Sequence, residues 1–226
     1  MLKLRCDHNR RIQVMLPFKT EIYTVQKAAW PDAGKHILAH YDQASVIVYQ
    51  AYNAPIADYA VQHQYFGGSF SFNRMSWIKP NFLWMMYRCG WAEKTNQERV
   101  LAIRITRAGF ENILAKAVHS AYLASTYADP ESWHSQVKNS EVRLQWDPDH
   151  NPYGNPVSRR AIQLGLRGSI LKSYAYDWII SITDITAFVK TGKHSVDRKD
   201  LGSLNMPFET VYEIEDAALA ARIFAD

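Results

Sequence analysis

The pattern of hydrophobic and polar positions along the chain is that of short strands separated by helices. Residues 45–52, SVIVYQAY, are rich in β-branched and aromatic side chains and predict a strand. Alternation along that strand would place Val48 and Gln50 on one face and Tyr49 on the other. Further strands are expected at residues 22–25, 99–105, 141–146, 160–166, 178–183 and 211–214.

Proline, glycine and small polar residues mark the helices expected between these strands. Pro55 favours a helix to about residue 63, and Pro80 favours one over 80–89 that stops at Gly90, because proline suits a first helical turn and glycine a helix end. Thr106 is expected to cap a helix to about residue 118. Further helices are expected at 169–176, 186–189 and 215–224, and polar loops at 147–156 and 191–205.

These elements do not follow the regular strand–helix–strand rhythm of a parallel sheet. They predict an α+β fold, a single domain in which helices pack on a mixed or largely antiparallel sheet. Residues 1–29 lack clean periodicity and are expected to form an N-terminal extension. Residues 30–214 would then form the α+β domain and residues 215–226 a C-terminal helical tail.

Composition and charge narrow the class of protein. The 226 residues are 47% hydrophobic and 21% charged, which is ordinary for a soluble globular protein. No apolar stretch approaches the roughly 18–20 residues of a membrane span, and no signal peptide is expected. The net charge of +4 permits an anionic ligand without requiring nucleic acid. Cys6 and Cys89 are expected to be free thiols of a cytoplasmic protein.

The common motifs of catalysis and nucleotide binding are missing. The sequence contains no G-x-G-x-x-G, P-loop, nucleophile-elbow, H-E-x-x-H or paired C-x-x-C motif. Asp147, Asp149 and His150 have the chemistry of a hard-metal cluster, but solvated turn residues explain them more simply. No metal site is therefore expected, and the motifs assign no cofactor.

The most distinctive segment is residues 74–91, RMSWIKPNFLWMMYRCGW, which holds three of the seven tryptophans. Arg74, Lys79 and Arg88 lie among its aromatic residues. Cations beside aromatic faces suit a phosphate with a stacked base, and they equally suit internal cation–π packing. Trp84 is expected to be largely buried, because an aromatic stripe on a helix is usually part of the core.

A second group of polar residues follows the strands expected near residues 141–146 and 160–166. Such a polar strand face either builds a site or faces solvent. We expect the cations and these polar residues to converge on one cleft. The candidate ligand-binding residues are Tyr49, Gln50, Arg74, Lys79, Arg88, Arg143, Gln145, Arg160 and Gln163.

Several segments, in a conserved order along the chain, resemble one known family. They are WP at 30–31, GKHILA at 34–39, VYQAY at 48–52, the run 74–91, QE at 97–98, VRLQWDP at 142–148 and RAIQLGL at 160–166. Together they resemble the bacterial and fungal family catalogued as domain of unknown function 4291, over about residues 30–190. The resemblance supports the domain boundary and the choice of residues, and it implies no chemistry.

Two kinds of function fit these residues, and whether the protein is an enzyme stays open. The first is binding or processing of a phosphate-bearing ligand, a nucleotide or an RNA end. One version, by analogy alone, is ADP-ribosyltransferase-like use of a nicotinamide dinucleotide, with Glu98 or Glu141 as the carboxylate. The alternative is a non-catalytic module that binds a macromolecule through an aromatic and arginine-rich surface. A concave site would favour the first, and a flat one the second.

Overall fold

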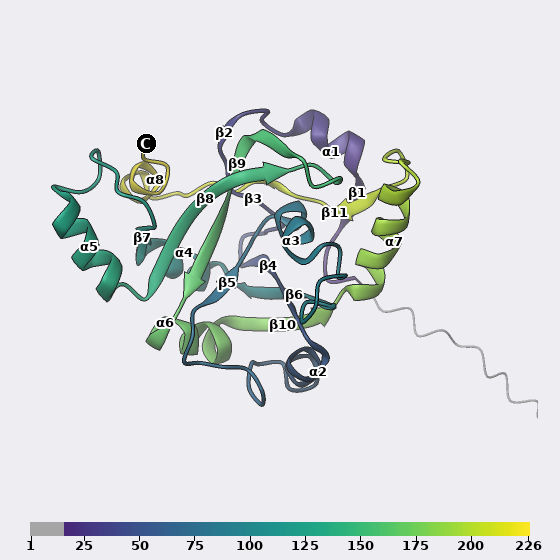
Figure 1. Ribbon diagram of the computed structural model, residues 1–226, viewed down its shortest axis with the longest axis horizontal. Coiled ribbons are helices and arrows are strands. Elements are labelled where there is room, and N and C mark those ends of the chain that lie inside the picture. Colours follow the sequence, from purple (N-terminus) through teal and green to yellow (C-terminus); the bar gives the residue numbers. More distant parts are fainter. Residues whose placement is uncertain (1–15) are drawn as a thin grey trace, which may run out of the picture.

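Two β-sheets form the centre of the computed structural model, which describes residues 16–226 (Figure 1). The smaller sheet is antiparallel, in the order β10-β6-β4, with strands Ile179–Asp184, Arg99–Thr106 and Ser45–Tyr52. The larger has the order β2-β9-β8-β7, with strands Gly34–Lys35, Pro156–Leu166, Val142–His150 and Ala117–His119. Strand β5, Ser76–Ile78, also pairs with β9. The β2–β9 and β7–β8 pairs are parallel and the other pairs antiparallel, which confirms the predicted α+β fold with a largely antiparallel sheet.

The two sheets meet at a seam formed by one pair of residues. Tyr49 on β4 and Lys79, which follows β5, form an isolated antiparallel bridge. The Tyr49 N–H donates to the Lys79 carbonyl at 2.7 Å, and the Lys79 N–H donates to the Tyr49 carbonyl at 3.3 Å. The backbone of Lys79 is therefore fixed by both sheets at once.

Strand β4 has the predicted bounds, and its two faces are buried in two different apolar clusters. Val46 and Val48 belong to the larger cluster, which also contains residues of α2 (Ala54–His63) and α4 (Arg107–Ala115). Ile47 and Tyr49 belong to the second cluster, with residues of α3 (Phe82–Cys89) and α7 (Thr186–Asp197). Because both faces are buried, five of the eight positions hold β-branched or aromatic residues, and this made the strand recognisable.

Eight α-helices and one short π-helix cover these sheets within residues 16–226. None of them is both long and apolar enough to cross a membrane. The helices are α1 Tyr23–Ala29, α2 Ala54–His63, α3 Phe82–Cys89, α4 Arg107–Ala115, α5 Pro130–Asn139, α6 Gly168–Ser173, η1 Tyr174–Trp178, α7 Thr186–Asp197 and α8 Ala217–Ile223.

Local capping explains where the central helices begin. The Asn81 side chain accepts the Trp84 N–H at 2.6 Å, so α3 starts just after Asn81, slightly later than Pro80 suggested. The helix ends at Gly90, whose φ of 59° is the left-handed conformation expected of a terminating glycine. Thr106 caps α4 through the Gly109 N–H, as predicted.

Five expected elements differ from the structure. The strand expected at 211–214 is shorter and begins earlier, as β12 covers Thr210–Val211. The strand expected at 22–25 lies earlier, as β1, Thr20–Ile22, and helix α1 begins at Tyr23. Helix α4 ends at Ala115, since the residues that follow pair with β8 as β7. The first part of the supposed loop at 147–156 is strand, because β8 stays paired with β9 as far as His150, and residues 151–155 form the loop. The supposed loop at 191–205 begins as the second half of α7.

Both ends of the described chain pack against this body. Strand β1 pairs with β11, Asn205–Pro207, and β12, Thr210–Val211, pairs with β3, Leu38–Ala39. Tyr23 is buried in the second cluster, and Ile223 on α8 is fully buried in the first. Residues 1–15, which hold half of the expected N-terminal extension and Cys6, lie outside the described residues.

The smaller sheet has β10 at one edge, and a side chain lies along that edge. Gln64, just after α2, adopts a left-handed conformation with φ of 62°. Its amide donates to the Ile182 carbonyl at 3.0 Å and accepts the Ile182 N–H at 2.8 Å. The side chain therefore bonds to β10 as one residue of a neighbouring strand would.

Candidate ligand-binding cleft

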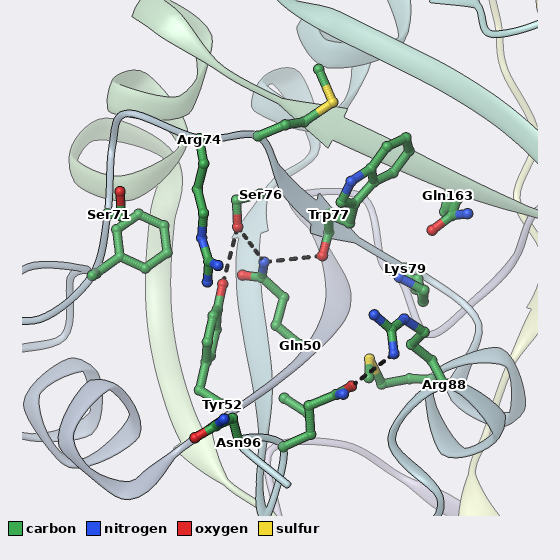
Figure 2. Close-up of a pocket in the computed structure, with 15 residues that line it drawn as sticks. Gln50, Tyr52, Ser71, Arg74, Ser76, Trp77, Lys79, Arg88, Asn96 and Gln163 are labelled. Atoms are coloured by element: carbon green, nitrogen blue, oxygen red, sulfur yellow. Dashed lines mark hydrogen bonds between the residues drawn. The ribbon is translucent and has the colours of Figure 1, made fainter. Parts of the chain in front are cut away.

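A cleft of about 490 Å³ opens beside the seam between the two sheets (Figure 2). Its floor comes from the end of β4, from β5 and Lys79, and from Gln163 on β9. Its walls come from the loop before β5, from α3 and from the segment that follows α3. Segments distant in sequence thus form one concave surface.

The charged residues that line the cleft are all cations. Arg74 comes from the loop before β5, Lys79 from the seam and Arg88 from the last turn of α3. No aspartate or glutamate is among the described residues that line it. Figure 2 shows the Lys79 and Arg88 side chains close together on one side, with Arg74 across the cleft near Tyr52. The surface is suited to a negatively charged ligand.

Lys79 is the most unusual of these cations. Its side chain is only 2% exposed, yet within residues 16–226 its ammonium group has no hydrogen-bond acceptor or ion-pair partner. The closest favourable contact is the ring of Trp84, whose centroid lies 5.8 Å from Nζ. Burial, and then the charge of Arg88, lower the pKa of Lys79 to about 8, while Asp147 opposes this shift. Strongly perturbed lysines of this kind are typical of functional sites.

Asp147 is held beside the cleft by two glutamines. Gln145 Nε2 donates to one carboxylate oxygen at 2.8 Å, and Gln163 Nε2 donates to the other at 2.7 Å. Gln145 and Gln163 face each other across β8 and β9, so the two amides and the carboxylate form one polar group on this face of the sheet. The glutamines therefore fix the orientation of a negative charge that acts on Lys79.

A second hydrogen-bonded group makes the floor rigid. Gln50 Nε2 donates to Ser76 Oγ at 2.9 Å and to the Trp77 carbonyl at 3.0 Å. Its Oε1 accepts the Tyr174 hydroxyl at 2.8 Å, and the Tyr52 hydroxyl lies 3.0 Å from Ser76 Oγ. Because the Gln50 amide is engaged on both sides by the protein, its main part is to hold the seam in place.

The structure brings five of the nine candidate residues together. Gln50, Arg74, Lys79, Arg88 and Gln163 line the cleft. The expectation that all nine surround it is wrong for the other four, which lie elsewhere on the same strands or on their opposite faces.

Each of these four residues has a definite place. Tyr49 is fully buried on the opposite face of β4, where its ring centroid lies 5.5 Å from that of Phe82. Arg160 is exposed and donates to the Trp146 carbonyl at 3.4 Å, beside a different cavity. Gln145 contacts Asp147 but does not line the cleft, and neither does Arg143. Strand alternation explains why Tyr49 and Arg160 do not line the cleft. Tyr49 is one residue from Gln50 and Arg160 is three from Gln163, so each faces the other side of its sheet.

The two candidate carboxylates also lie outside the lining. Glu98 is exposed, and its Oε1 accepts the Asn96 N–H at 2.8 Å. Glu141 accepts the Ser169 N–H at 2.7 Å and the Ser169 hydroxyl at 2.5 Å, which lowers its pKa. Glu141 thus holds the beginning of α6, and neither residue faces the cleft.

The polar loop cluster that suggested a metal has a structural explanation. Arg159 donates to Asp149 Oδ2 through Nε at 2.8 Å and Nη2 at 2.6 Å. His150 stacks on Tyr87, with ring centroids 3.5 Å apart. Among residues 16–226, no group of three or more His, Cys, Asp or Glu residues is placed to hold a metal ion.

Trp84 is buried, as predicted, with 6% of its surface exposed. It stacks on Tyr87 and on His150, with ring centroids 5.3 Å and 5.2 Å away. Trp91 lies beyond the helix end and donates its Nε1–H to the Pro152 carbonyl at 3.1 Å. The tryptophans of the 74–91 run are therefore mostly core, and the cations beside them line the cleft.

Four further residues line the cleft from loops, and of these Gln97 alone had a signal in the sequence, in the QE pair of the family resemblance. Phe70, Ser71, Asn96 and Gln97 line it from two loops. Gln97 accepts from Arg88 Nη1 at 3.4 Å. A glycine pair such as that at 67–68 is typical of a loop, but the local pattern does not predict that this loop packs over the sheet.

Comparison with known proteins gives one result on identity. A search of curated proteins finds no match. The family described as "Domain of unknown function (DUF4291)" matches residues 36–212, which is most of the chain and contains every residue of the cleft. The resemblance predicted from the sequence is thereby confirmed, with a match that extends further toward the C-terminus, and the chain belongs to the DUF4291 family.

Proposed function

We propose that the cleft binds the phosphate group of a nucleotide or of an RNA end, for recognition or for processing. The observation that carries this proposal is Lys79, a buried cation without an anionic contact among residues 16–226. A buried charge is costly unless it is paired, and the protein offers Lys79 only a π contact and the more distant field of Asp147. A phosphate in the cleft would complete the pairing.

The other lining residues support the same ligand. Arg88 and Arg74 offer guanidinium groups, which bind phosphate oxygens in bidentate fashion. Ser71, Asn96 and Gln163 offer groups that hydrogen-bond to a sugar or a base. The volume of about 490 Å³ lies within the roughly 300–1,000 Å³ of small-molecule sites.

The concave shape favours a ligand site over a flat macromolecular interface. The ADP-ribosyltransferase-like version has less support, since neither Glu98 nor Glu141 lines the cleft.

Calorimetric titration of nucleotides, nicotinamide dinucleotide and short 5′-phosphorylated RNA tests the proposal. Lys79→Ala should weaken binding by about 1–3 kcal/mol and leave the circular dichroism spectrum unchanged. Lys190→Ala is the matched control, because Lys190 is an exposed cation on α7 outside the cleft. Added salt should weaken binding to the wild type. If the wild type binds none of these ligands, the proposal fails and the macromolecule-binding alternative takes its place.

A further inference from the structure

A row of aromatic rings leads from the cleft to the protein surface. Phe70 lines the cleft, and its ring centroid lies 5.0 Å from that of Phe72. Phe72 stacks on Tyr176 at 5.5 Å, and Tyr176 lies 5.6 Å from Tyr65. Two further rings continue the row beside Tyr65. We call this set the aromatic strip: Tyr59, His63, Tyr65, Phe72 and Tyr176.

The strip presents ring surface to solvent where the core aromatic residues do not. Tyr176 is 53% exposed and Tyr65 is 36% exposed. Phe70, at the cleft end of the row, is 7% exposed. The row of rings therefore reaches beyond the buried core, and exposed apolar surface of this kind often marks an interaction site.

The backbone that carries Tyr176 is a π-helix, η1, which continues from α6. Within it Tyr174 is fully buried and its hydroxyl reaches Gln50 under the cleft, while Tyr176 is exposed on the strip. Single π-helical turns are frequent at functional sites. One turn of η1 therefore supports both the floor of the cleft and the strip.

The loop between α2 and β5 joins the strip to the cleft from the other side. The Tyr59 ring packs so closely on Gly67 and Gly68 that a Cβ atom at either position would lie 2.7 Å from it. Only glycine leaves room for this contact. The loop that begins with these glycines carries Phe70, Phe72 and Arg74. The contact with Tyr59 therefore positions two rings and one cation of the cleft together.

We infer that the ligand of this site is a single-stranded oligonucleotide, with a phosphate in the cationic cleft and neighbouring bases stacked on the aromatic strip. The inference rests on the proposed function and extends it from a phosphate group to a polynucleotide. The charge of the cleft matches a phosphate backbone, and rings in a row match successive bases of any sequence. Single strands are specified because a duplex hides the faces of its bases.

Fluorescence anisotropy with a 3′-labelled, 5′-phosphorylated RNA hexamer tests the inference, with the DNA hexamer and the RNA duplex beside it. Unlabelled mononucleotide is measured by calorimetry. The single-stranded hexamer should bind at least about tenfold more tightly than the mononucleotide. Tyr176→Ala should weaken hexamer binding by about 5–50-fold and leave mononucleotide binding unchanged. Tyr176→Phe, which keeps the ring, should retain hexamer binding.

Tyr153→Ala is the matched control, since Tyr153 is a 45% exposed tyrosine that belongs to neither the strip nor the cleft. Equal affinity for hexamer and mononucleotide, equal affinity for duplex, or no effect of Tyr176→Ala would overturn the inference. If the wild type still binds the mononucleotide and Lys79→Ala does not, the proposed function stands even when the inference fails. Absence of binding to every ligand would remove both.

Discussion

Lys79 and Arg159 are both buried cations next to a tryptophan, yet among residues 16–226 Arg159 has a carboxylate partner and Lys79 has none. Arg159, 7% exposed, donates twice to Asp149, once to the Pro31 carbonyl, and lies 5.3 Å from the ring centroid of Trp30. Lys79, 2% exposed, has a tryptophan ring and no such carboxylate contact within residues 16–226. Arg159 is thus completed by the chain itself, and Lys79 is not.

Ion-paired arginines occur at several other places in the fold. Arg99, Arg104 and Arg107 form ion pairs with carboxylates, as Arg159 does. The three cations of the cleft form none among the described residues, and Lys79 is the one of the three that is buried. A protein keeps an unpaired buried charge at the expense of its stability, so such a charge indicates a requirement other than folding.

Removal of the paired cation should give the largest effect. Arg159→Ala leaves the Asp149 carboxylate buried and unpaired, and this should lower the free energy of unfolding by about 3–5 kcal/mol. Urea denaturation measures the loss. The adjacent Arg160→Ala is the control, because Arg160 is exposed and should change stability by less than about 1 kcal/mol. Equal stability of the two variants would break the comparison.

Trp84 lies on α3, which forms one wall of the cleft, and its substitution tests whether this helix belongs to the core. Trp84→Ala should lower the free energy of unfolding by about 3–5 kcal/mol, as truncation of a large buried aromatic residue does. The same denaturation experiment applies, with Tyr87→Ala as a partner that is 42% exposed. An unchanged free energy of unfolding would show that Trp84 is a surface aromatic residue and would contradict the core interpretation.

Removal of the unpaired cation should have the opposite sign. Lys79→Met keeps the apolar stem and removes the buried charge, so it should raise the free energy of unfolding by about 1–3 kcal/mol at pH 7. The folded protein lowers the pKa of Lys79 from 10.5 to about 8. The destabilisation caused by the buried charge is therefore complete below pH 8 and decreases as the pH rises toward 10.5. Urea denaturation at pH 7 and pH 10 checks both statements. A variant less stable than the wild type at pH 7 would show that the ammonium supports the fold.

The smallest expected effect is the pH dependence of ligand binding. Lys79 loses its charge as the pH rises through about 8, so phosphate binding should weaken by up to about tenfold between pH 7 and pH 9. A phosphate monoester stays doubly ionised over this range, because its second pKa is about 6. Lys79→Ala should give a flat profile over the same interval. Parallel profiles for the two proteins would assign the titration to another group.

Strand β4 and helix α7 show what the sequence can and cannot predict. Strand β4 was recognised because burial on both faces gives it a continuous run of β-branched and aromatic residues at 46–49, followed by Tyr52. The second half of α7 contains Gly192 among polar residues, and this pattern suggested a loop. A Cβ at Gly192 would lie 2.9 Å from the Trp91 ring, so this glycine allows close packing and does not break the helix. Long-range packing of this kind leaves no local signal.

The same limit applies to the cleft. Its three cations were predicted because they lie in one unusual run, and that information is local. Tyr49 was misplaced because neighbouring residues of a strand face opposite sides. The loop that carries Phe70 and Ser71 reaches the cleft through its seat on Tyr59, a contact that composition does not reveal.

Gln64 has a consequence for the behaviour of the protein in concentrated solution. Strand β10 is an edge strand with Ile180 51% exposed, and such edges recruit strands from other molecules. The Gln64 amide occupies both backbone groups of Ile182, the positions an incoming strand would use first. The residue that ends helix α2 therefore also covers the backbone of the edge strand at a position that intermolecular β-pairing would need.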